Sequence, residues 1–221
     1  MSNQIPVMNR VIGQWLNPPQ GLAPAVDCAN CSRATFEPDR AARWRDYKCC
    51  AFQPFIANFY CGAMLEAGVS PLPAAAQAVA QPIGVLATRE FRNLCDATPD
   101  RNRTEAHLCA YYKRESRQCG IWQFRPGECS LYYCTNDDNK AARERWSERA
   151  FAFETNVAQM ALVYAGFSPG RIAEQVTFLN EPPLGLASVS DVLEVYRACW
   201  DWVKSQSRED LLAFDIPPGR G

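Results

Sequence analysis

The spacing of apolar and polar residues predicts a mainly helical protein. From Trp146 to Tyr164, apolar residues recur at intervals of three and four positions, as on one face of a long helix. Asn136 or Asp137 can cap this helix and Gly166 can end it. The expected buried stripe is Trp146, Ala150, Phe153, Val157, Met160 and Tyr164. Further helices are expected at about 169–179 and 189–205, the second with Ser188 and Asp191 as a capping pair.

The first half of the chain has a less regular pattern. Residues 1–27 predict an irregular arm, and residues 40–48 a short helix that ends at two adjacent cysteines. A second helix is expected to start at Pro54 and stop at Gly68. Its apolar stripe is Phe55, Ile56, Phe59, Tyr60, Ala63 and Met64. Residues 69–87 are rich in proline and alanine, so we expect a connector there with at most one short helix.

A small β-hairpin is expected just before the long helix. Residues 120–124 and 129–133 are rich in aromatic residues and suit two short strands. Between them, Pro126 and Gly127 occupy the positions that a type II turn requires. The predicted fold is therefore mainly α with a small β-hairpin. An irregular cysteine-rich metal-binding domain over 1–135 precedes a helical C-terminal extension, 136–221, packed on it.

Composition places the cysteines in a particular chemical setting. With 221 residues, 48% of them hydrophobic, the chain can bury a core without disulfides. It nevertheless has 11 cysteines, an odd number. The N-terminal residues show no secretory signal and no apolar run reaches the length of a membrane span, so we expect a soluble cytoplasmic protein whose thiols stay reduced. A net charge of −1 gives no indication of a nucleic-acid or membrane partner.

Eight of the cysteines have spacings typical of metal ligands. They are Cys28 and Cys31 in a CxxC pair, the adjacent Cys49 and Cys50, and then Cys109, Cys119, Cys129 and Cys134. The turn within CxxC lets two thiolates converge on one ion, and four sulfurs complete a zinc site or hold a 4Fe-4S cluster. Eight thiolates suffice for two such sites, although one site with spare thiols remains open. The alternative is a set of buried thiols that act as small apolar side chains.

The segment from Cys119 to Cys134, CGIWQFRPGECSLYYC, resembles the signature of the YkgJ-like bacterial cysteine-cluster family, the zinc- or iron-chelating CxxCxxCC domains. The resemblance covers about half the chain, and it implies that all eight cysteines named above are ligands. Two departures from the family pattern are the 17 residues between Cys31 and Cys49 and a long insertion before Cys109. The family also includes lysine methylase-like proteins, but no methyl-donor motif is visible here.

The remaining candidates have less specific patterns. Cys199 lies on the apolar face of its predicted helix and is expected in the core, whereas Cys61 is a reserve ligand. His107 is the only histidine. Arg125 is expected either to offset thiolate charge or to be a solvated turn residue.

Three kinds of function stay open. The first is an iron–sulfur protein in a redox or enzyme-assisting role, and the second is a zinc-stabilised module that binds a protein partner. The third is a protein (lysine) methylase-like enzyme. The sequence does not decide whether the chain is an enzyme.

Overall fold

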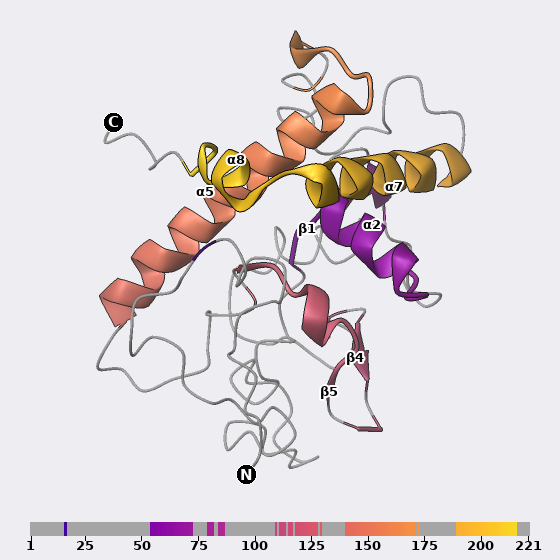
Figure 1. The fold of residues 1–221 in the computed structure, drawn as a ribbon. Coiled ribbons are helices and arrows are strands. Elements are labelled where there is room, and N and C mark those ends of the chain that lie inside the picture. The colour runs from indigo at the N-terminus through magenta and orange to yellow at the C-terminus, as the bar shows by residue number, and fades with distance from the viewer. Residues whose placement is uncertain are drawn as a thin grey trace.

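The fold is taken from a computed structural model in which a defined part of the chain is described. That part comprises Leu16 and residues 54–72, 79–81, 84–86, 109, 111–113, 115–116, 118–127, 129, 140–170, 172 and 189–215. Its regular helices are α2 (Asn58–Glu66), α5 (Lys140–Tyr164), α7 (Val189–Ser205) and α8 (Arg208–Leu212). In Figure 1, α7 runs across both α2 and α5. The expectation of a mainly helical protein is confirmed.

Two helices end in the same local motif. In α2, the N–H of Gly68 donates to Leu65 O at 3.1 Å and the N–H of Val69 donates to Met64 O at 2.8 Å. Gly68 has φ 71°, a left-handed conformation that glycine adopts without steric cost. At the end of α5, Gly166 with φ 96° repeats this arrangement. Both predicted helix ends are confirmed.

Helix α2 lies at the centre of the core. All of its residues from Asn58 to Met64 are buried, because α7 covers one side and α5 another. A Cβ atom at Gly62 would lie 2.1 Å from Tyr196 O and 2.5 Å from Trp200 Cβ, so the backbones of α2 and α7 come very close there. Residues on both sides of the predicted boundary at 136 therefore contribute to one core.

The described strands form two small antiparallel sheets. In the first, β1 (Ile56–Ala57), β3 (Gly84–Leu86) and β2 (Val79–Gln81) lie in that order. Ile56 pairs with Val85, and Val85 also pairs with Ala80. In the second, β4 (Tyr112–Lys113) pairs with β5 (Gln118–Cys119). The presence of a small two-stranded antiparallel sheet is confirmed.

The position predicted for the hairpin is wrong. Residues 122–124 form a short 3-10 helix, η4 (Trp122–Phe124), instead of a strand, and the two-stranded sheet lies earlier, over 112–119. Gly127 is not among the described glycines with positive φ, so no type II turn forms there. The Gly127 N–H donates to the Glu154 carboxylate on α5, so this segment is held by a helix and not by a partner strand.

Two further boundaries differ from the prediction. The helix expected from Pro54 begins at Asn58 because Ile56 and Ala57 pair with β3. The expected connector over 69–87 contains strands β2 and β3, each of three residues. Strands this short show too few alternations for a period of two to be recognised in the sequence.

The long helix rotates its buried face along its length. Trp146, Ala150, Phe153 and Val157 are buried as expected, but Met160 and Tyr164 are 38% and 67% exposed. An α-helix drifts by about 20° per seven residues relative to a strict 4-3 spacing. The buried positions near the C-terminal end are therefore Ala158, Ala161 and Leu162.

Other expectations are met only in part or fall on undescribed residues. Helix α7 covers the predicted 189–205, and the described residues of the segment predicted at 169–179 are helical. Of the predicted N-terminal arm only Leu16 is described, and it is buried in the core. The helix at 40–48 and the capping positions Asn136, Asp137 and Ser188 lie outside the described residues. Within the described ranges, no helix is both long and apolar enough to cross a bilayer.

Candidate metal centre

Three of the eight candidate cysteines belong to the described part of the chain. Cys109 is buried, and Cys119 and Cys129 are half-buried. The other five candidates lie outside the described residues: Cys28, Cys31, Cys49, Cys50 and Cys134. Cys95 and His107 lie outside them as well. The eight-cysteine ligand set therefore stays a prediction.

Backbone contacts at Tyr111 and Tyr112 bring the segments of Cys109 and Cys119 together. The Tyr112 N–H donates to Cys109 O at 2.9 Å, and Tyr112 pairs with Cys119 across β4 and β5. The Gly120 N–H donates to Tyr111 O at 2.7 Å. These contacts bring together two candidate ligands that are ten positions apart in the sequence.

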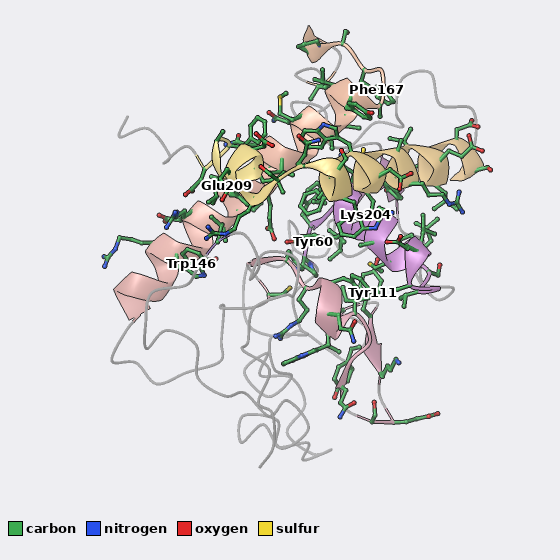
Figure 2. The ribbon with its side chains drawn as sticks, in the orientation of Figure 1. Tyr60, Tyr111, Trp146, Phe167, Lys204 and Glu209 are labelled. Atoms are coloured by element: carbon green, nitrogen blue, oxygen red, sulfur yellow. The ribbon has the colours of Figure 1, made fainter. Side chains whose placement is uncertain are left out.

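Helix α2 brings a third sulfur to the same region. Cys61 is buried on α2, where its Sγ lies 3.6 Å from Ile56 O. Tyr111 and Cys119 pack against the core cluster that contains Cys61. The Tyr111 hydroxyl donates to Pro71 O, just beyond α2, and Figure 2 shows this ring near the junction of α2 with the segment carrying β4.

The pKa of the Tyr111 hydroxyl is consistent with this arrangement. Its pKa is raised, first by burial and then by the negative charge that Cys61, Cys109 and Cys119 would carry as thiolates. Cys61, kept in reserve at the level of sequence, belongs to this neighbourhood.

The three sulfurs do not form a ligand set by themselves. Among the described residues, no group of three or more His, Cys, Asp or Glu side chains is arranged to hold a metal ion. Their chemistry nevertheless suits zinc or an iron–sulfur cluster, both of which thiolates bind. A tetrahedral centre that uses Cys109 and Cys119 therefore needs further donors from undescribed segments.

The segment that leads to Cys129 is firmly held. Arg125 is only 3% exposed, and its guanidinium carbon lies 3.4 Å from the centroid of the Trp122 ring. The alternative of a solvated turn residue is therefore wrong for Arg125. Two residues later, the Gly127 N–H donates to Glu154 Oε1 at 2.8 Å.

Sequence reasoning missed Glu154. This residue is 4% exposed on α5, and its Oε1 also accepts a hydrogen bond from the Tyr60 hydroxyl at 2.8 Å. Figure 2 shows Tyr60 in the middle of the molecule, where α2, α5 and α7 converge. The available signal was the position of an acidic residue between Phe153 and Val157, on the buried face of the predicted helix.

The expected place of Cys199 in the core is confirmed. It is fully buried on α7, on the face shared by Val192, Tyr196 and Val203. Burial raises the pKa of its thiol, because the thiolate would lose its hydration. Cys199 is therefore a neutral, apolar part of the core.

Comparison of the chain with protein-family models, curated proteins and solved structures finds no significant match.

Proposed function

We propose that this protein holds a thiolate-bound metal centre, an iron–sulfur cluster or zinc, in a reducing compartment. The observation that carries the proposal is the backbone pairing that brings the segments of Cys109 and Cys119 together, with Cys119 packed against the core cluster that contains Cys61. The centre would draw on Cys109, Cys119 and Cys129, completed by Cys28, Cys31, Cys49, Cys50 and Cys134.

The surroundings favour an iron–sulfur cluster in a redox or enzyme-assisting role. All the candidate donors are sulfurs, which iron–sulfur clusters use in preference to mixed donor sets. Tyr111, Phe124 and Cys119 all pack against the core, and aromatic side chains near a cluster would exclude water from it. The resemblance to the cysteine-cluster family supports the same donors.

A zinc-stabilised module that binds a protein partner is the second candidate. The observation that favours it is the exposed apolar surface near the end of α5, where Met160, Val163 and Tyr164 face solvent. In this case the metal would only stabilise the fold, and the helices would make the contact.

Metal analysis of anaerobically purified protein separates the two candidates. An iron–sulfur protein would be brown and would contain iron with acid-labile sulfide, whereas a zinc module would be colourless and contain zinc. Protein that contains neither metal, and takes up neither after reduction and reconstitution, would refute the proposed function.

A further inference from the structure

A buried carboxylate connects the helical core to the segment that precedes Cys129. Glu154 lies inside the molecule, where a charged group needs hydrogen-bond partners. Its Oε1 receives two donors, the Tyr60 hydroxyl from α2 and the Gly127 N–H from the segment before Cys129, each at 2.8 Å. Glu154 therefore joins three parts of the chain that are far apart in sequence.

The backbone at Gly127 rests directly on α5. A Cβ atom at this position would lie 2.5 Å from the Cβ of Ala150, which is much closer than two carbon atoms can approach. Ala150 lies one helical turn before Glu154, and both are buried. The Ala150 side chain and the Glu154 carboxylate together form the surface on which Gly127 rests, which we call its seat. Just before it, the Arg125 guanidinium is stacked over the Trp122 ring.

This seat limits where Cys129 can lie. Two residues of extended chain span at most about 7 Å, so the Cys129 backbone cannot move far while Gly127 stays on α5. We propose that Glu154 is the positioning residue for Cys129 at the metal centre. The inference rests on the proposed function, in which Cys129 is a ligand, and it makes the C-terminal helix part of the support for that ligand.

The test compares two substitutions of similar size, Glu154→Gln and Glu154→Leu. The amide of Gln keeps an oxygen acceptor for both donors, whereas Leu keeps none. Supporting groups around metal ligands typically contribute about 10- to 100-fold to metal affinity. We therefore expect Glu154→Leu to release metal to EDTA at least about tenfold faster than wild type, and Glu154→Gln to release it within about twofold of wild type.

A second readout separates local from general loosening. Iodoacetamide labelling of the metal-loaded protein, followed by peptide mass spectrometry, gives the rates for Cys129 and for the buried reference Cys199. In Glu154→Leu, Cys129 should label faster while Cys199 stays at its wild-type rate. Unchanged Cys129 labelling and metal release in this variant would overturn the proposal.

Matched controls remove other hydrogen bonds of the same interface. Tyr60→Phe breaks the bond from α2 but leaves the Gly127 bond intact. Asn58→Ala removes the bond from Asn58 Nδ2 to Ala158 O, which joins α2 to α5 at 2.9 Å. Both should lower stability and leave Cys129 labelling unchanged. If they expose Cys129 as much as Glu154→Leu does, the effect is general and the proposal is wrong.

Gly127→Ala provides an independent route if Glu154→Leu does not fold. The added methyl group would push the segment off Ala150 while Glu154 and Tyr60 remain in place. Faster Cys129 labelling, reversed by adding Ala150→Gly, would support the seat, and labelling at the wild-type rate would refute it. If wild-type protein holds no metal, the proposed function fails, and labelling of metal-free protein still decides whether Glu154 positions Cys129.

Discussion

Cys199 shows how burial changes the chemistry of a single side chain. It is a neutral thiol within the packed face of α7, and burial alone raises its pKa. When a thiol stays protonated in the folded state, the free energy of unfolding is unaffected by pH as long as the thiol of the unfolded chain is protonated too. It falls once the unfolded thiol begins to ionise. The stability of the protein therefore depends on pH in part through Cys199.

Replacing Cys199 should reduce the loss of stability at alkaline pH. Above about 8.5, the ordinary pKa of cysteine, the unfolded thiol ionises while the folded one keeps its proton, so the free energy of unfolding falls as pH rises. This group should contribute a loss of about 1.4 kcal/mol per pH unit in that range. Urea unfolding at about pH 7 and about pH 9.5 measures the effect. Equal losses in wild type and Cys199→Ala would contradict the assignment.

Replacing a candidate ligand should have a different effect. Cys119→Ser and Cys129→Ser should each lower the metal content per chain and the melting temperature, because serine is a poor ligand for a thiophilic metal and metal binding is coupled to folding. Elemental analysis and thermal unfolding measure both quantities. Cys199→Ala is the control and should keep its full metal content. Normal metal content and stability in both serine variants would remove these residues from the ligand set.

At the scale of single elements, the helix ends depend on glycine. Beyond α5, the Phe167 N–H donates to Leu162 O at 3.0 Å and the Gly166 N–H donates to Val163 O at 3.1 Å. This arrangement needs a left-handed residue at Gly166, where nothing lies within 4 Å of an added Cβ. The cost of a side chain there is therefore conformational and not a clash.

Gly166→Ala should lower the free energy of unfolding by about 1 kcal/mol because alanine disfavours the left-handed conformation. Gly170→Ala is a matched control, since Gly170 is helical, exposed and also has nothing within 4 Å of its added Cβ. That change should be neutral or stabilise the protein by up to about 1 kcal/mol. Chemical denaturation of both variants gives the comparison. A similar loss in both would show that the φ angle of Gly166 is not the cause.

At the scale of the whole molecule, the close contact of α2 with α7 organises the core. Gly62 allows the α2 backbone to approach Tyr196 O, and the surface beside this contact carries an ion pair between Lys204 Nζ and Glu66 Oε1 at 2.8 Å. The Trp200 indole N–H also donates to Glu66. The contact thus has a tightly packed interior and a polar margin.

Gly62→Ala should separate the two helices and destabilise the whole protein. A methyl group at this position meets backbone atoms of α7, which cannot rotate away as a side chain can. Overpacking of this kind typically costs about 1 to 3 kcal/mol. Glu66→Ala, which removes the exposed ion pair with Lys204 and the hydrogen bond from the Trp200 indole at the margin, should cost less. Thermal unfolding of the two variants tests this order, and a reversed order would show that the interior contact is not the stronger one.

The sequence by itself determined the features that depend on neighbouring residues. The extent of α7, the ends of α2 and α5 at Gly68 and Gly166, and the place of Cys199 in the core all follow from local spacing or from the φ angle of one residue. The spacing of the cysteines also predicts metal chemistry, which metal analysis is to test.

Only the tertiary structure decided the features that depend on distant residues. Strands of two or three residues form where a partner lies beside them, so β1, β3 and β2 assemble from segments without a recognisable pattern. Arg125 is buried because its guanidinium stacks on the Trp122 ring within the folded core. Cys61 lies in the core cluster against which Tyr111 packs, because α2 is at the centre of that cluster. Glu154 bonds to a tyrosine 94 positions away and to a glycine 27 positions away. A buried charge is tolerated only when such partners converge on it, and their convergence is a property of the folded chain.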